Sequence, residues 1–212
     1  MATSVTRKSA KKLLLFLAGR SYPTLHRLAR FLYLCAWYGN SRIRKVVATN
    51  LALCFPQLCP EKREQLCRQA VHETLMTGME MPRLWLHDSL EENLYAGIDG
   101  QELIQQAMGS GKGVIMITPH LGNWEYLILK MAALYPCSVL CNNTDDIVPM
   151  QMNEIIQSGR MKTGATMVEA KQGVKVLVEA LQRGEIVMIA PDQIPTKSKG
   201  RQFADFFGQP TA

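Results

Sequence analysis

The stretch TPHLGNWEYL, at residues 118–127, contains the residue types that could perform acid–base chemistry. An uncharged apolar run at residues 114–118 leads into Pro119 and His120, and Glu125 follows the histidine by five residues. Because proline lacks an N–H group and helps to end a strand, His120 is expected at the carboxyl end of a strand. Open α/β sheets bind their ligands at that end.

His120 and Glu125 are predicted to act as a base and the residue that orients it. A spacing of five does not stack two side chains on one helix face, but a turn can bring the carboxylate to one imidazole nitrogen. The other nitrogen could then accept a proton. Asn123 suits the N-cap of a helix that begins at Trp124, and the N–H groups there favour developing negative charge. The alternative is a structural histidine bonded to a nearby carboxylate.

The pair has no protein nucleophile beside it. A G-x-S-x-G motif is absent, which argues against a serine hydrolase. H-E-x-x-H is also absent, and one histidine with one glutamate makes a poor metal site, so no metal is expected. These residues suit direct transfer, in which the base activates a hydroxyl group of a substrate.

Short apolar runs and helical stretches alternate from about residue 100 onward. This alternation of short strands and helices predicts an α/β fold with a mostly parallel or mixed sheet flanked by helices. The uninterrupted run at residues 114–118 predicts a strand that is covered on both faces. Strands are expected at residues 114–118, 138–141, 165–168 and 186–190, and helices at residues 101–108, 123–135, 150–159 and 174–183.

Residues 41–91 are predicted to be helical. Pro60 can open a helix, and Cys67, Val71, Leu75 and Met79 recur every four residues as a buried stripe. This helical annex is expected to extend to about residue 95 and the α/β core to occupy residues 96–212. Together they would form one domain at residues 46–212, preceded by a separate region at residues 1–45.

Residues 1–45 are predicted to be a basic, amphipathic, membrane-associated helical region. Residues 1–60 contain ten Lys or Arg and no Asp or Glu, whereas residues 61–212 have a net charge of −4. In PTLHRLARFLYLCAWYG, the residues His26, Arg27 and Arg30 would face one side, and Leu25, Leu28, Ala29 and Leu32 the other. Basic, aromatic and amphipathic helices lie in anionic membrane surfaces. The alternative is a core helix with solvated arginines.

The composition excludes several other classes. With 47% hydrophobic and 20% charged residues, the chain is expected to be ordered. The six cysteines form no C-x-x-C pair and are expected to be reduced and mostly buried. The apolar runs at residues 13–19 and 31–41 are too short to span a bilayer. Basic residues are interleaved with leucine and phenylalanine without a nucleic-acid-binding motif, so no nucleic-acid partner is expected.

The motif HLGNWE resembles the H-x-x-x-x-D/E signature of the glycerolipid acyltransferases, and the chain is most similar to their lipid A branch. Three further stretches support this resemblance. NLALCFP at residues 50–56 is similar to the family's N-terminal helical region, IAPDQIPTKSKG at residues 189–200 to its PDQ block, and FFGQPTA at residues 206–212 to the block that follows. The resemblance therefore covers residues 12–212.

The resemblance implies roles for individual residues. His120 would be the general base and Glu125 would orient it and balance its charge. Arg160 would bind the phosphate or sugar of the acceptor, unless it is a solvated arginine at a helix end. Trp124 would line an acyl slot, unless it belongs to the core. The other residues expected to bind substrate are Gly122, Asn123, Asp192, Gln193, Lys197 and Lys199, of which the lysines could equally be surface charges.

By the same resemblance, the chain is expected to move a fatty acyl group from acyl carrier protein or coenzyme A onto a lipid A precursor, without a cofactor. It would act at the cytoplasmic face of the inner membrane, held there by anionic lipid. Family members are longer, so the C-terminal part of the family fold is expected to be missing. Other acceptors remain possible by this reasoning: a lysophospholipid, an ornithine lipid or a mannosylated inositol lipid. A shortened, inactive membrane-docking protein is the alternative from another class.

Overall fold

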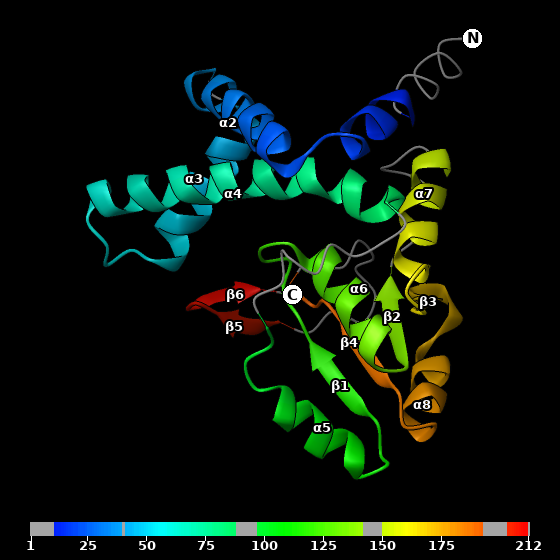
Figure 1. Cartoon of the computed structure of the whole chain (residues 1–212). Helices are drawn as coiled ribbons and strands as arrows, with labels where there is room; N and C mark the ends of the chain where they lie inside the picture. Colours follow the sequence, from blue (N-terminus) through cyan, green and yellow to red (C-terminus); the bar gives the residue numbers. More distant parts are fainter. Residues whose placement is uncertain (1–10, 40, 88–96, 142–149, 193–202, 212) are drawn as a thin grey trace. The chain divides into compact units, whose positions relative to one another are not determined.

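The computed structural model of the chain describes residues 11–39, 41–87, 97–141, 150–192 and 203–211 (Figure 1). The chain divides into two compact units. Residues 1–19 and 81–191 form an α/β unit, and residues 20–80 and 192–212 form a mainly helical unit. Helix α4 (Pro60–Leu86) contributes to both units, because the division falls between Glu80 and Met81.

The α/β unit is built on a parallel sheet of four strands (Figure 1). The strands are β1 (Val114–Ile117), β2 (Cys137–Cys141), β3 (Thr166–Glu169) and β4 (Ile186–Ile189), in the order β1-β4-β2-β3. All three pairings are parallel. The prediction of an α/β fold with a parallel sheet flanked by helices is confirmed.

Four helices of this unit also lie where the sequence predicts them. They are α5 (Gln101–Gly109), α6 (Trp124–Leu134), α7 (Met150–Met161) and α8 (Val174–Gln182). One apolar cluster joins Ile128 and Met131 of α6 to Val139 and Met188 of the sheet, and α5 packs at its edge. A second cluster joins Leu177 of α8 to other strand residues. Helices therefore cover parts of both faces of the sheet.

One face of β1 is exposed, and the prediction that this strand is covered on both faces is wrong. Ile115 is 57% exposed and Ile117 is 61% exposed. The cluster beneath α8 contains residues of β2, β3 and β4 but none of β1, which is one of the two edge strands of the sheet. An apolar run reports the hydrophobicity of a strand, whereas its coverage depends on which helix lies over its position in the sheet.

The helical unit contains α2 (Tyr22–Tyr38), α3 (Arg42–Cys54) and the part of α4 before Met81. It also contains the hairpin of β5 (Ala204–Phe206) and β6 (Gln209–Thr211). Its core holds Trp37, Cys67 and Val71, which confirms the buried part of the predicted stripe on α4. The guanidinium carbons of Arg44 and Arg68 lie 4.3 and 4.2 Å from the Trp37 ring centroid, so two cations pack on this indole.

The predicted amphipathic helix is α2, and Pro23 lies in its first turn as expected. Leu25 and Ala29 are buried, whereas Arg27, Arg30 and several apolar side chains are exposed. Leu32, which the pattern placed on the apolar side of the helix, is among these exposed residues, and the others are Phe31, Leu34 and Tyr38. None of the helices in the described ranges is long and apolar enough to span a membrane.

The cysteines are free in the structure, but only three of the six are buried. These are Cys67, Cys137 and Cys141, while Cys35 and Cys59 are exposed. Burial, together with the nearby charge of Glu185, raises the pKa of the Cys137 thiol to about 12. Burial also raises the pKa of Cys141. Both thiols of β2 are therefore protonated at neutral pH and are poor nucleophiles.

Glu185 should make the stability of the α/β unit depend on pH. Its carboxylate accepts hydrogen bonds from Ser138 Oγ and Arg183 Nε, each at 2.7 Å. Burial opposes ionisation, but these bonds lower the pKa of Glu185 below 4.5. A lowered pKa adds stability above the unfolded-state pKa, and this stability is lost as the pH falls through the folded-state pKa. We expect a loss of about 1 kcal/mol as the pH falls from 4.5 through this lowered pKa.

Urea unfolding at a series of pH values measures this loss. Glu185→Gln should remove most of the decrease in the free energy of unfolding at acidic pH, and Ser138→Ala should remove part of it. Identical acid dependence in Glu185→Gln and the unsubstituted chain would contradict the assignment.

Candidate active site

His120 follows the carboxyl end of β1, as predicted. The ladder between β1 and β4 is extended by a bond from Thr118 N–H to the carbonyl of Ile189 at 3.0 Å, and the chain then turns at Pro119. The His120 side chain is partly buried. Its ring contacts the Trp124 ring edge-on, with centroids 5.0 Å apart and planes at 75°. The imidazole is therefore positioned against the first residue of α6.

The turn between His120 and α6 depends on Gly122 and Asn123. Gly122 has a φ of +58°, in the left-handed region that glycine adopts without strain. Asn123 is the N-cap of α6, and its side chain accepts a hydrogen bond from Tyr126 N–H at 3.3 Å. The predicted cap and the predicted start of the helix at Trp124 are both confirmed. The positive end of the α6 dipole thus lies in the segment that follows His120.

Glu125 is a buried charge in the first turn of α6. Its side chain is 1% exposed and forms an ion pair with Arg160 of α7, which is 20% exposed. Arg160 Nε donates to Glu125 Oε2 at 2.8 Å, and its Nη2 donates to Oε1. Trp85 Nε1, at the end of α4, donates to Oε2 at 3.0 Å. Three donors from two other helices therefore hold this carboxylate.

The ion pair stabilises the charged form of Arg160. Burial alone would lower the pKa of Arg160, but the hydrogen bonds and the charge of Glu125 outweigh it and raise the pKa above its ordinary value. A bidentate pair between guanidinium and carboxylate also fixes the relative orientation of two planar groups. That Arg160 binds the acceptor stays a prediction. The structure shows that Arg160 bonds to Glu125, which was not predicted from the sequence.

The end of α4 is itself attached to α7. Lys162 Nζ donates to the carbonyl oxygens of Leu84 and His87, which lie where a helix end leaves its carbonyls without helical partners. A Cβ atom at Gly159 would lie 2.6 Å from Trp85 Cβ and 2.7 Å from its Cα. The absence of a side chain at Gly159 therefore permits the close contact between α7 and Trp85.

Sequence reasoning missed Trp85 and Lys162. Trp85 is 40 residues from Glu125, and Lys162 is 78 residues from Leu84. No local periodicity or motif links positions so far apart, because the contact depends on how helices pack.

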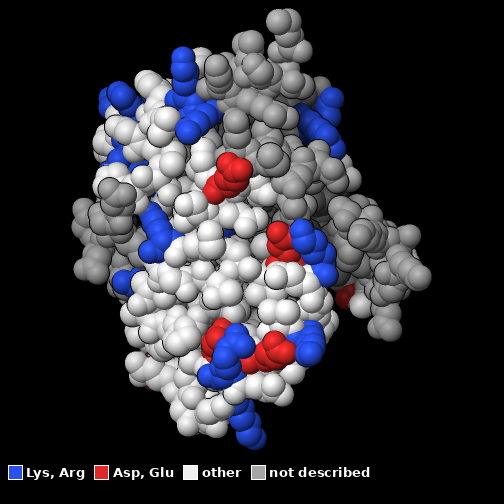
Figure 2. Space-filling view, turned by 90° about the vertical axis from the view of Figure 1, so that its right-hand side faces the viewer, with Lys and Arg blue, Asp and Glu red and all other residues white. Residues whose placement is uncertain are grey.

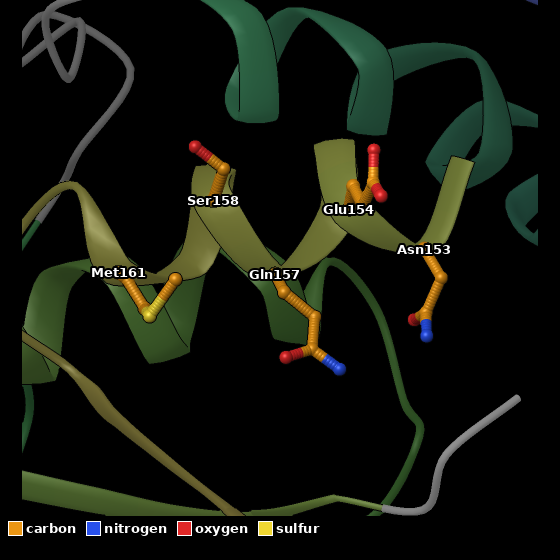
Figure 3. A pocket seen from close by; sticks show the side chains of 5 residues that line it. All are labelled: Asn153, Glu154, Gln157, Ser158 and Met161. Carbon is orange, nitrogen blue, oxygen red and sulfur yellow. The ribbon is translucent and has the colours of Figure 1, made fainter. Parts of the chain in front are cut away.

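A hollow of about 330 Å³ lies on α7, the helix that also carries Arg160. In Figure 3 the side chains of Asn153, Gln157 and Met161 extend from one side of the helix, and those of Glu154 and Ser158 from another. The lining side chains carry two amides, a hydroxyl, a carboxylate and a thioether, and most of the lining surface is apolar.

The other predicted substrate-binding residues are Asp192, Gln193, Lys197 and Lys199. Asp192 is exposed and belongs to the other unit of the chain. Gln193, Lys197 and Lys199 lie outside the described residues. Within the described ranges, no group of three or more His, Cys, Asp or Glu residues could hold a metal ion.

Several surface charges of the α/β unit are paired. Lys171 pairs with Glu169, Lys175 with Glu179, and Arg183 with Glu185. In the lower part of Figure 2, basic and acidic side chains accordingly lie next to each other. That part of the drawn face therefore presents no basic patch suited to an anionic partner.

The fold and the site define an α/β protein with a candidate base after the first strand of a parallel sheet and a buried carboxylate in the following helix. The chain belongs to the bacterial lipid A biosynthesis acyltransferase family, whose model matches residues 13–212. The resemblance noted from the motifs is thereby confirmed.

Individual relatives are similar over most of this chain. A lipid A biosynthesis palmitoleoyltransferase of Escherichia coli (strain K12) is 27% identical over 187 residues, covering 88% of this chain and 59% of the relative. A lauroyltransferase of the same organism is 25% identical, covering 81% and 55%. A myristoyltransferase is also 25% identical, covering 87% and 55%. The chain thus spans less than three fifths of the length of these relatives.

Proposed function

We propose that the protein transfers a fatty acyl group from an acyl thioester to a hydroxyl group of a lipid A precursor. The observation that carries the proposal is the placement of His120 after β1, beside a capped helix whose first turn holds Glu125. Membership of the lipid A acyltransferase family supports the reaction class. The relatives named for palmitoleoyl, lauroyl and myristoyl transfer support a fatty acyl group as the one transferred.

In this proposal one imidazole nitrogen of His120 accepts the proton of the acceptor hydroxyl. The oxygen attacks the thioester carbonyl carbon, and the α6 dipole favours the negative charge that develops on the carbonyl oxygen. The C–S bond then breaks, the ester forms, and the thiolate takes the proton from His120. Glu125 orients the imidazole and balances its transient positive charge. The raised pKa of the buried thiols of β2 is consistent with direct transfer.

The donor in this proposal is acyl carrier protein or coenzyme A, and the acceptor is a phosphorylated glucosamine lipid. The amide and hydroxyl groups along α7 are suited to hydrogen bonds with sugar hydroxyls. Arg160, Asp192, Gln193, Lys197 and Lys199 remain proposed substrate-binding residues. Gly122, Asn123 and Trp124 would shape the site around the reacting groups.

Mass spectrometry of acceptor lipids tests the proposal. Labelled acyl carrier protein and acyl coenzyme A would each be offered with a tetraacylated lipid A precursor, a lysophospholipid, an ornithine lipid or a mannosylated inositol lipid. The 212-residue chain and the longest polypeptide its gene encodes would be assayed in parallel. A mass gain of one acyl chain on the lipid A precursor supports the proposal. A mass gain on another lipid alone would show that this lipid, and not the lipid A precursor, is the acceptor. No mass gain with any combination of donor and acceptor would reject the proposed reaction.

We also propose that the protein acts at the cytoplasmic face of the inner membrane, bound to anionic lipid through its basic N-terminal region. Arg27 and Arg30 are exposed on α2 near the exposed Phe31, a combination of charge and apolar surface suited to a lipid interface. Each basic residue near such a surface contributes about 1 kcal/mol. The same contacts would serve a docking protein without catalytic activity, the second candidate function.

Replacing both arginines with glutamine should weaken binding to vesicles containing phosphatidylglycerol by roughly 30-fold, equivalent to about 2 kcal/mol. Sedimentation with vesicles measures the affinity. Lys112→Gln with Lys175→Gln changes the net charge equally at exposed positions of the α/β unit and should leave binding unchanged. Equal weakening in both double variants would assign the effect to net charge instead of α2.

A further inference from the structure

Trp85 reaches the candidate site from a helix that carries none of the predicted catalytic residues. Its indole N–H donates to Glu125 Oε2 at 3.0 Å, and it comes from the last turn of α4. We propose that Trp85 is a positioning residue for acyl transfer, holding the carboxylate of Glu125 in the orientation that supports His120. This inference rests on the proposed function and adds a residue to its site.

The Glu125 carboxylate depends on protein donors because its side chain is 1% exposed. A buried carboxylate that loses a donor is not compensated by bulk water. Arg160 supplies one bond to each oxygen, and Trp85 supplies a second bond to Oε2. Without the indole N–H, the contacts that the structure describes to Oε1 and Oε2 would be reduced to the two bonds from the end of the long Arg160 side chain. The carboxylate could then rotate together with the guanidinium.

Trp85 is itself held firmly. Its backbone and Cβ pack on Gly159, where an added Cβ would lie within 3 Å of three of its atoms. Lys162 bonds the carbonyl oxygens of Leu84 and His87 on either side of it. An indole has only two side-chain torsions, so fixing its backbone largely fixes its N–H. The segment of residues 159–162, at the end of α7, therefore positions both donors to Glu125. It contains Arg160 itself, and it holds Trp85 in place by contacting the end of α4.

This arrangement makes a specific demand on the indole nitrogen, beyond the volume of the ring. Packing requires a bicyclic side chain at position 85, whereas positioning requires its N–H group. The analogue 3-benzothienylalanine has nearly the shape of tryptophan but carries sulfur in place of N–H. Inserted at position 85 by nonsense suppression, it separates the two requirements without opening a cavity.

The kinetic test compares the analogue with tryptophan inserted at position 85 by the same method. Loss of one hydrogen bond to a buried charged group should lower kcat roughly tenfold, with KM within about twofold of the control. The same analogue at Trp37, which lies in the helical unit, should leave kcat unchanged. Full kcat with the analogue at position 85 would overturn the proposal and leave Trp85 a packing residue.

An independent spectroscopic test does not require activity. The chain has three tryptophans, so an indole ¹H–¹⁵N spectrum has three signals, and Trp85→Phe identifies the one from Trp85. Glu125→Gln should shift that signal more than the signal of Trp37 and speed the exchange of its proton with solvent. An unmoved Trp85 signal would overturn the positioning role.

The two tests distinguish failure of this inference from failure of the proposed function. Absence of transfer by the unsubstituted protein would reject the reaction, and the indole signal would still decide whether Trp85 holds Glu125. Transfer by the unsubstituted protein with an unchanged rate for the analogue would keep the reaction and reject the role of Trp85.

Discussion

Replacing His120 with alanine is expected to lower kcat for acyl transfer by about a thousandfold. General base catalysis by a positioned side chain contributes roughly 10²–10⁴-fold, and no other described residue of the segment between β1 and α6 carries an imidazole. His120 is partly exposed, so its loss should change the free energy of unfolding little. Initial rates with labelled acyl thioester and acceptor, measured beside thermal unfolding, separate the two effects.

His72→Ala provides the matched control. His72 lies on α4 in the helical unit and bonds its neighbour Glu73, so its replacement should leave the rate unchanged. Added imidazole should restore part of the activity of His120→Ala by entering the space left by the side chain. Equal transfer by His120→Ala and the unsubstituted protein would reduce His120 to a structural residue and end the proposed mechanism.

Replacing Arg160 with alanine is expected to reduce the free energy of unfolding by about 3 kcal/mol. The change leaves the carboxylate of Glu125, 1% exposed, without its charged partner. Breaking a buried ion pair by removing one member costs roughly 3–5 kcal/mol, and the partial exposure of Arg160 favours the lower value. Urea unfolding followed by circular dichroism measures the change.

Two comparisons test the cause of this loss. Lys175→Ala breaks a surface pair in the same unit, in which the lysine is 88% exposed and Glu179 is 48% exposed, and should cost less than about 0.5 kcal/mol. Glu125→Gln combined with Arg160→Met removes both charges and should recover much of the stability lost in Arg160→Ala. A cost for Arg160→Ala no greater than that for Lys175→Ala would show that the buried pair is not stabilising.

The sheet and its helices were predictable from the chain because their signals are local. Apolar runs bounded by glycine, proline and polar residues mark β1 to β4, and the periodic stretches between them mark α5 to α8. The cap at Asn123 and the turn at Gly122 could also be anticipated, since capping and positive φ depend on residue type within a few positions.

The coverage of β1 could not be predicted in the same way. Its four residues are all apolar, yet Ile115 and Ile117 are exposed because the α8 cluster lies over the other strands. On α2 the periodic pattern placed Leu25, Ala29 and Leu32 on one side of the helix, and of these only Leu25 and Ala29 are buried. In both elements the pattern identified the apolar side chains, and packing decided which of them are buried.

By itself, the sequence determined helices α5 to α8, strands β1 to β4, the position of His120 after β1 and the family to which the chain belongs. It did not predict the hairpin of β5 and β6. Only the tertiary structure decided what surrounds Glu125. Trp85, Glu125 and Arg160 lie 40 and 35 residues apart along the chain, on three different helices. Secondary structure follows from interactions between near neighbours, whereas a buried charge can be stabilised only by the groups that folding brings to it.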